Sequence, residues 1–260
     1  MPLMTYEQYR EIKHPTPYTF SIQSGSNFLY YFGERHSYDP AHEEWIIEKT
    51  FWQSFLKDTE GHKRIVLVEG GKRKTEATEE QSIVNGGGMG FITYLASQQG
   101  IDTVCPEPDR AYERKELLKH FSREESQYYY FARVVGQWNR RQEPKPDFEE
   151  YMNEFLEEDK KDTGWNNFDF SIEMMKRIHT ALFHTEFDKN DLEFFHTICN
   201  PSRTDTVINK VARASSEIRD KHIVQEIKKY LDEGYSVYVQ FGGTHAVMQE
   251  PLLKELLITG

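Results

Sequence analysis

The sequence predicts an α/β protein with a mainly parallel central sheet flanked by helices, and a helical insertion between the third and last core strands. Short runs rich in β-branched and aromatic residues alternate with longer segments of helical periodicity. Such alternation favours a parallel sheet covered by helices. In the middle of the chain, about 80 residues contain helix-like segments and no convincing strand, a length within the ordinary domain range. We therefore expect a single α/β domain, residues 1–260, with a helical insertion or cap at about 112–200.

Five strand-like runs can be recognised along the chain. The first two, residues 18–22 and 27–32, are separated by a short turn and predict a hairpin or two neighbouring strands. The remaining three span residues 64–68, 101–105 and 235–241. The helical segment that precedes residues 101–105 fits a right-handed crossover between parallel neighbours.

Helices are predicted between and after these strands. Asp39 as N-cap and Pro40 at the first helical position predict a helix start, and apolar residues at helical spacing continue to Lys57. Two helical pieces, residues 78–84 and 89–99, are divided by a run of glycines. The other predicted helices span residues 113–120, 124–138, 148–160, 170–183, 206–232 and 245–257.

The composition limits the classes of partner. The net charge is −11 and 29% of the residues are charged, which argues against nucleic-acid or anionic-membrane partners because no stripe of Lys and Arg offsets the negative charge. No apolar run approaches the ~20 residues that span a bilayer, and the first residues lack the apolar core of a signal peptide. Cys105 and Cys199 are too few for a disulfide framework. We expect a cytoplasmic protein, and the sequence does not indicate its oligomeric state.

Two matching tetrapeptides point to a functional site. Gly33-Glu34-Arg35-His36 follows the second strand-like run, and Gly242-Gly243-Thr244-His245 follows the last one. Two strand-like runs, residues 64–68 and 101–105, lie between these tetrapeptides in the chain. Each is followed by a glutamate, Glu69 or Glu107, instead of a histidine. Ligands of parallel α/β sheets bind beyond the carboxyl ends of the strands. The residues expected to meet there are His36, Glu69, Glu107 and His245.

Two imidazoles and two carboxylates allow two kinds of chemistry. They could form the ligand shell of a divalent transition metal, which would lower the pKa of a bound water. They could also work without a metal, with a histidine as general base and a glutamic acid of raised pKa as acid. A third interpretation is that each residue only caps a strand or helix. The sequence leaves all three open.

Other residues near these motifs have alternative interpretations. Glu34 either assists His36 or pairs with a neighbouring arginine. Arg219-Asp220 lies midway along the predicted helix 206–232, where a solvated charge pair is the default expectation, although one member could face the site. The glycine run of residues 86–90 follows a helix and lacks the spacing of nucleotide-binding motifs. It could bind an anion at the start of the next helix, or simply provide flexibility.

The motifs, in this order, resemble the Tiki/TraB/PrgY-like superfamily, with erythromycin-esterase-like and ChaN-like proteins as wider relatives. Residues 33–36 are similar to the Gly-Glu-x-His form of the esterase and ChaN branches. Glu69 and Glu107 resemble the glutamates that follow the next strands in this superfamily. Arg219-Asp220 looks like the Arg-Asn/Asp pair of its helix. The resemblance covers residues 27–109 and 212–257.

The resemblance implies a hydrolase-like site that acts on an amide or ester bond of a small-molecule or peptide substrate. Tiki proteins are metal-dependent proteases that use Mn or Co, whereas erythromycin-esterase-like members use His and Glu without a metal, ChaN-like members bind haem and TraB/PrgY proteins inhibit peptide pheromones. By this likeness Arg219 would stabilise an oxyanion and Glu34 would move a proton. Mn, Co or Zn would be held by His36, Glu69, Glu107 and His245. The alternatives are a non-catalytic pocket for haem or a small ligand, and a scaffold for protein contacts.

Overall fold

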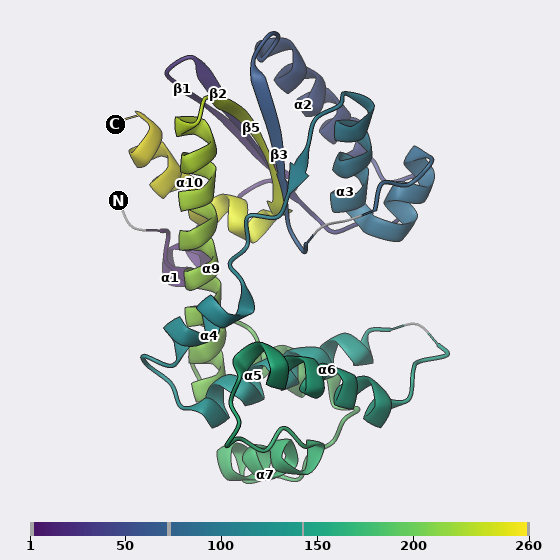
Figure 1. The fold of residues 1–260 in the computed structure, drawn as a ribbon, viewed down its shortest axis with the longest axis vertical. Helices are drawn as coiled ribbons and strands as arrows, with labels where there is room; N and C mark the ends of the chain where they lie inside the picture. Colours follow the sequence, from purple (N-terminus) through teal and green to yellow (C-terminus); the bar gives the residue numbers. More distant parts are fainter. Residues whose placement is uncertain (1–2, 72–73, 142, 259–260) are drawn as a thin grey trace. The chain divides into compact units, whose positions relative to one another are not determined.

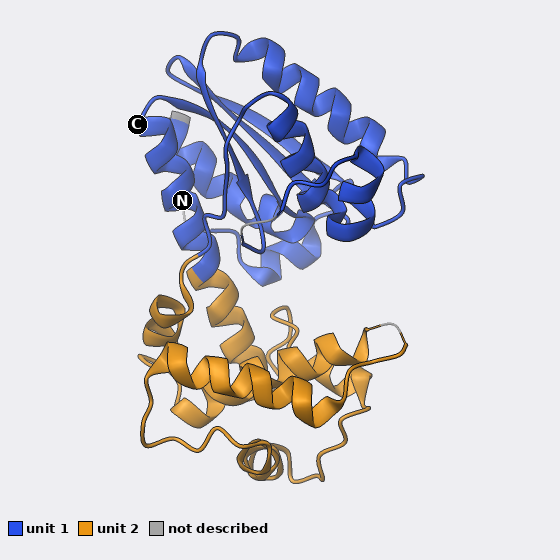
Figure 2. Cartoon of the chain, turned by 45° about the vertical axis from the view of Figure 1, so that its right-hand side comes forward, with its two compact units in different colours: residues 1–107, 219–260 blue, residues 108–218 orange. Residues whose placement is uncertain are grey.

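The computed structural model describes residues 3–71, 74–141 and 143–258. The chain divides into two compact units, which Figure 2 shows in different colours. Unit 1 comprises Met1–Glu107 and Arg219–Gly260, and unit 2 comprises Pro108–Ile218. The predicted helical block, residues 112–200, falls inside unit 2, which is longer at both ends.

Unit 1 contains a five-stranded sheet in the order β1-β2-β5-β3-β4. β1 pairs with β2 in an antiparallel hairpin, and all other neighbours are parallel. The predicted α/β fold with a mainly parallel sheet is therefore confirmed. The strands are β1 Tyr18–Ser24, β2 Asn27–Glu34, β3 Lys63–Val68, β4 Thr103–Val104 and β5 Tyr235–Gly242.

Helices cover both faces of this sheet (Figure 1). Alternate side chains of a strand point to opposite faces, so a strand that is buried on both faces has few polar positions. One face, called the α2/α3 face, packs against α2 (Glu44–Asp58) and α3 (Glu79–Gln98). The other, the α9/α10 face, packs against the end of α9 (Val207–Asp232) and α10 (Gly243–Ile258). Along β5, Val237, Val239 and Phe241 belong to the α9/α10 face, and Tyr238 belongs to the α2/α3 face.

Two predicted boundaries are corrected. The helix that was predicted to begin at Asp39 and Pro40 is α2, and it begins at Glu44. Asp39 Oδ1 instead accepts a hydrogen bond of 2.9 Å from the backbone N–H of Ala41, so this carboxylate closes a turn before the helix. The strand predicted at 101–105 is reduced to β4, since Pro106 has no N–H with which to extend the ladder.

Other helices agree with the sequence pattern or were missed by it. The glycine run interrupts α3 at Gly87, whose φ of 58° and ψ of −149° are not helical, so the predicted division is present as a kink. The short helix α1 (Tyr6–Glu11) was not predicted, although Thr5 and Gln8 form a capping box at its start. None of the described helices combines the length and apolar character that crossing a bilayer needs.

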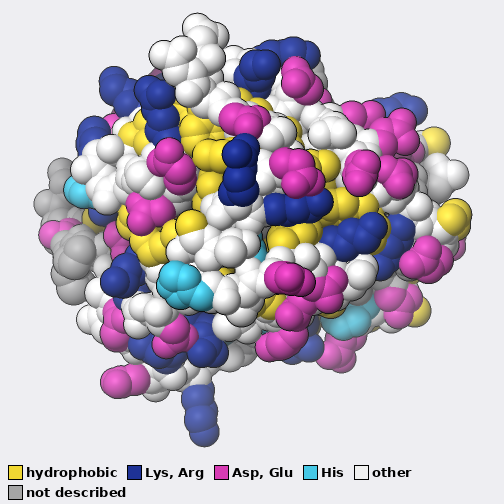
Figure 3. Space-filling model, turned by 90° about the horizontal axis from the view of Figure 1, so that it is seen from below, with side chains coloured by type: hydrophobic (Ala, Val, Ile, Leu, Met, Phe, Trp, Pro, Cys, Tyr) yellow, Lys and Arg dark blue, Asp and Glu magenta, His cyan; other side chains and the backbone are white. Residues whose placement is uncertain are grey.

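Unit 2 is built from helices, and its described residues include no strand. Its core is rich in aromatic residues. Arg114 and Asp159 form an ion pair that is almost fully buried, and the Arg114 guanidinium lies over the ring of Tyr130. Figure 3 shows one face of the molecule, on which basic and acidic side chains are interspersed. The helices lying wholly in unit 2 are α4 Arg110–Leu117, α5 Arg123–Asn139, α6 Phe148–Thr163, α7 Ile172–Phe183 and α8 Leu192–Ile198.

Candidate active site

The carboxyl ends of the parallel strands β2, β5 and β3 meet at one edge of the sheet in unit 1. Glu34 ends β2, Gly242 ends β5, and Glu69 follows β3 directly. A cavity of about 340 Å³ lies at this edge. Its lining residues are Tyr9, His14, Thr16, Glu34, His36, Glu69, Gly242, Gly243, Thr244 and His245. The structure therefore brings Glu34 together with His36, Glu69 and His245, which are three of the four residues expected to meet at this edge.

Glu34 binds His36 directly. The distance from His36 Nδ1 to Glu34 Oε1 is 2.5 Å, and the Glu34 side chain is only 2% exposed whereas that of His36 is 54% exposed. The second carboxylate oxygen of Glu34 accepts a hydrogen bond of 3.1 Å from Gln240 Nε2. The hydrogen bond to Glu34 raises the pKa of His36, and burial opposes this effect only in part. Of the two interpretations of Glu34, pairing with histidine is the one observed.

The backbone of His36 is held in an unusual conformation. Its φ of 62° lies in the left-handed region, which costs a non-glycine residue about 1–3 kcal/mol when the surroundings enforce it. Gly242 makes this placement possible, because a Cβ atom there would lie 2.7 Å from His36 Nε2. The absence of a side chain at Gly242, in the second tetrapeptide, therefore leaves space for the imidazole of His36, in the first tetrapeptide.

His245 is held in a similar way from the other face of the sheet. Its Nδ1 lies 2.6 Å from Asp220 Oδ1, and the Asp220 side chain is 1% exposed. Gln249 Nε2 donates to the same oxygen at 2.7 Å, and Tyr31 donates its hydroxyl proton to Gln249 Oε1. Burial lowers the pKa of His245, but the charge and hydrogen bond of Asp220 outweigh burial and the pKa is raised.

The expectation that Arg219-Asp220 is a solvated pair is wrong for Asp220, which is fully buried. A sequence signal for this burial exists. Asp220 precedes the buried residues Ile223, Val224 and Ile227 by three, four and seven positions, which places all four on one side of the helix. An acid on an apolar helical face requires a partner, and His245 is that partner.

Each histidine therefore binds a buried carboxylate through Nδ1. The carboxylate of Glu34 reaches its ring from the end of β2, and that of Asp220 from α9. A carboxylate accepts the Nδ1 proton, so in the neutral ring Nε2 carries the lone pair. Both rings line the cavity. The arrangement supplies two oriented groups that can take up or donate protons.

Glu69 lies beside His245 and the guanidinium of Arg219. Its Oε2 accepts a hydrogen bond of 3.1 Å from the N–H of Gly242. Its Oε1 lies 4.0 Å from His245 Nε2 and 3.6 Å from Arg219. Arg219 also forms a close ion pair with Glu107. The guanidinium of Arg219 thus contacts both Glu69 and Glu107.

Glu107 is not among the residues that line the cavity. Its carboxylate accepts a hydrogen bond of 2.8 Å from the N–H of Gly70. Burial raises the pKa of Glu107, but the charge of Arg219 and the hydrogen bonds outweigh it and lower the pKa. The structure places Glu107 as a partner of Arg219 rather than beside the two imidazoles.

Two groups of site residues were missed by the sequence analysis. The first comes from the segment that begins with α1: the Tyr9 hydroxyl lies 3.2 Å from Thr244 Oγ1 and 3.2 Å from His14 Nε2. The capping-box sequence at Thr5 is the only signal for this segment.

The second is Gly88 in the glycine run. A Cβ atom on Gly88 would lie 1.5 Å from Glu34 Oε2 and 2.6 Å from Gln240 Nε2. The backbone of α3 therefore approaches the Glu34 carboxylate more closely than any other residue type permits. This close approach, and not flexibility alone, accounts for a glycine here.

The predicted set of four metal ligands includes two glutamates, Glu69 and Glu107, that share a contact with Arg219. A guanidinium beside them opposes the binding of a cation. Within residues 3–71, 74–141 and 143–258, no three His, Cys, Asp or Glu side chains are placed to hold an ion together. Metal binding at His36, Glu69, Glu107 and His245 stays a prediction, and no chemical step is derived through it.

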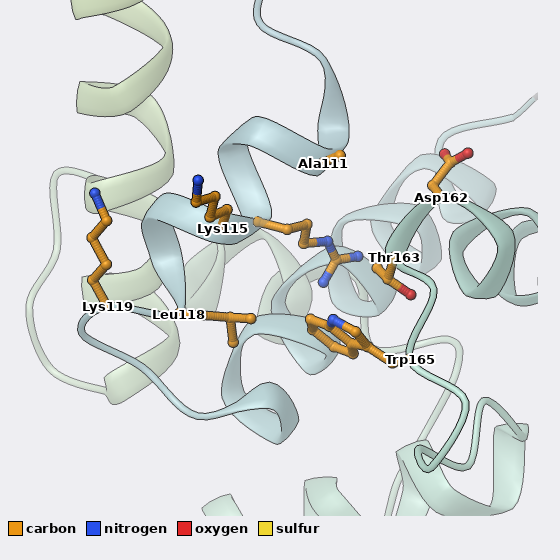
Figure 4. A pocket seen from close by; sticks show the side chains of 8 residues that line it. Ala111, Lys115, Leu118, Lys119, Asp162, Thr163 and Trp165 are labelled. Atoms are coloured by element: carbon orange, nitrogen blue, oxygen red, sulfur yellow. The ribbon is translucent and has the colours of Figure 1, made fainter.

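A separate cavity of about 400 Å³ lies in unit 2 (Figure 4). Its wall includes the ring of Trp165 and the side chain of Leu118, with Lys115 and Lys119 nearby. None of the six predicted site residues lines it. Four of these six, Glu34, His36, Glu69 and His245, line the cavity at the sheet edge instead.

Comparison of the chain with known proteins found no matching family model, no matching curated protein and no matching solved structure. The fold and the site define an α/β protein with two carboxylate-bound histidines at the carboxyl edge of its sheet. Membership of the Tiki/TraB/PrgY-like superfamily remains a prediction from the motifs.

Proposed function

We propose that the protein is a hydrolase that cleaves an ester or amide bond of a small-molecule or peptide substrate by proton transfer between histidines and water. The observation that carries this proposal is the pair of imidazoles on one cavity, each with Nδ1 fixed by a buried carboxylate. A histidine oriented through Nδ1 presents Nε2 to a reacting group, which is the arrangement that general acid–base catalysis needs.

His36 is the proposed general base. Its Nε2 takes a proton from a water molecule while the water oxygen attacks the carbonyl carbon, and Glu34 stabilises the imidazolium that forms. The protonated His245 donates a hydrogen bond to the oxyanion of the tetrahedral intermediate, with the positive charge of Arg219 behind it. When the intermediate collapses, His36 returns its proton to the leaving alcohol or amine. The products are a carboxylic acid and that alcohol or amine.

Replacing either histidine tests these roles. His36→Ala and His245→Ala are each expected to lower kcat/KM by about 10²–10⁴-fold, the range for loss of a general acid or base. Wild-type kcat/KM should depend on two ionisations, both with a pKa raised above 6.5: loss of the proton from His36 raises the rate, and loss of the proton from His245 lowers it. The assay is a panel of p-nitrophenyl esters and fluorogenic peptides, with unfolding curves to verify the fold.

His14→Ala is the matched control, because His14 lines the same cavity but its ring is bonded to the Tyr9 hydroxyl and the Pro15 carbonyl rather than to a carboxylate. An equal loss in His14→Ala, or full turnover in His36→Ala, would contradict the assignment of the base.

A metal-dependent hydrolase is the second candidate. It is favoured by the carboxylates at Nδ1, which are typical partners of metal-binding histidines. If proton transfer alone is sufficient, the rate should survive dialysis against EDTA, and mass spectrometry should find no metal that is lost in His36→Ala and His245→Ala. Loss of the rate after EDTA, with recovery on adding Mn, Co or Zn, would establish the metal-dependent reaction instead.

Two further expectations from the sequence belong to this proposal. Binding of haem or another small ligand without turnover is the alternative use of the cavity, and an absorbance band on adding haem to a protein that hydrolyses nothing would favour it. A cytoplasmic location is supported by Cys105 and Cys199, which are both free thiols.

A further inference from the structure

A group of buried acidic side chains lies on the α2/α3 face behind Glu34. The exposed fractions of Glu34, Glu44 and Glu48 are 3%, 1% and 0%, and Gln240 is fully buried beside them. Glu34 binds His36 and Gln240, and Glu44 accepts a hydrogen bond from the N–H of Arg35. Neither oxygen of Glu48 has a hydrogen-bond partner, and neither does Oε1 of Gln240.

Burial and two neighbouring carboxylates disfavour a negative charge on Glu48, and the contact with Gln240, which lowers the pKa of Glu48, offsets them only in part. Its surroundings are Glu44 on the same helix, Glu34 on β2, and Gln240 and Tyr238 on β5. Burial raises the pKa of Glu48 well above its usual range, and the charges of Glu34 and Glu44 raise it further. A neutral carboxyl group has one O–H donor, and the unpartnered Oε1 of Gln240 is an acceptor.

We propose that Glu48 is a positioning residue: its neutral carboxyl donates a hydrogen bond to Gln240 Oε1, which fixes the Gln240 amide so that Nε2 donates to Glu34. The Gln240 amide could otherwise rotate by half a turn. Its oxygen would then face the Glu34 oxygen, and two acceptors repel each other. Glu48 removes this possibility. The chain of contacts runs from Glu48 through Gln240 and Glu34 to Nδ1 of His36.

The catalytic consequence rests on the proposed function, whereas the hydrogen-bond chain does not. Losing the donor at Glu48 leaves Gln240 free to turn and weakens the hold of Glu34 on His36. The pKa of His36, which that hydrogen bond raises, should then move toward its usual value of 6.5. This shift can be measured whether or not a substrate is known.

The test compares two substitutions of similar size. Glu48→Gln keeps a neutral donor and should retain the wild-type titration of His36, whereas Glu48→Met has no donor and should lower the pKa of His36. The titration is followed by NMR, with the His36 signal assigned from its loss in His36→Gln. Infrared spectra at neutral pH should also show the C=O band of a protonated carboxyl group in the wild type that is missing in Glu48→Gln.

If the protein hydrolyses a panel substrate, kcat should fall about tenfold in Glu48→Met, as expected for one lost buried hydrogen bond, and remain near wild type in Glu48→Gln. Glu43→Met, at an exposed position before α2, is the control and should change none of these readouts. An unchanged His36 titration in Glu48→Met would overturn the proposal. Equal damage in Glu48→Gln would also overturn it, because it would show that Glu48 acts as an anion. A wild type without activity would count against the proposed function only.

Discussion

Gly88→Ala is expected to displace the Glu34 carboxylate and to destabilise the protein by about 1–3 kcal/mol, the usual cost of overpacking a core. A Cβ atom at this position would overlap Glu34 Oε2, at 1.5 Å. Glu34 and Gln240 are buried, so neither can move aside into solvent. Urea unfolding gives the loss of stability, and NMR titration should show that the pKa of His36 falls when the Glu34 contact is lost.

Two variants make this expectation specific. Gly136→Ala, in the last turn of α5, adds a Cβ whose nearest contacts are ordinary, at 3.6 and 3.8 Å, and should raise stability by about 0.5–1 kcal/mol through helix propensity. In Gly88→Ala combined with Glu34→Ala, the overlapping carboxylate is absent, so the double variant should lose less stability than the sum of its single variants. Additive losses would show that Gly88 and Glu34 are not in contact.

Asp220→Asn is expected to destabilise the protein by about 1.5–3 kcal/mol near pH 6, because the amide cannot accept the charged hydrogen bond of His245 as the carboxylate does. The expected effect depends on pH. The pKa of His245 is raised in the folded state, so its stabilising contribution is complete below the unfolded value near 6.5 and is lost as the pH rises through the folded pKa. The stability difference between wild type and Asp220→Asn should therefore shrink at high pH.

Unfolding curves between pH 6 and pH 9 measure this difference. The control is Asp232→Asn at the end of α9, where the carboxylate is 61% exposed and pairs with Lys228, so its effect should be small and constant over this range. A difference for Asp220→Asn that stays constant or grows with pH would contradict the pairing of Asp220 with His245.

The sequence located the edge of the sheet where the site lies but could not assign a role to each residue there. Four residues near the ends of strand-like runs were enough to locate this edge: Glu34, His36, Glu69 and His245. Parallel strands that end together place the residues after them close to one another. Glu107 follows the same rule in sequence. Its place was decided by Arg219, whose guanidinium holds it as an ion-pair partner outside the cavity lining.

By itself, the sequence determined the α/β class, the parallel strands and the strand ends that carry the two histidines, since these features depend on local periodicity and on glycine breaks. Only the tertiary structure decided which carboxylate holds which imidazole, why Gly88 must lack a side chain, and that the segment with α1 lines the cavity. These contacts join distant positions: the hydrogen bond between Gln240 and Glu34 spans 206 residues. Such pairs are set by the packing of helices on the two faces of the sheet, which local patterns do not encode.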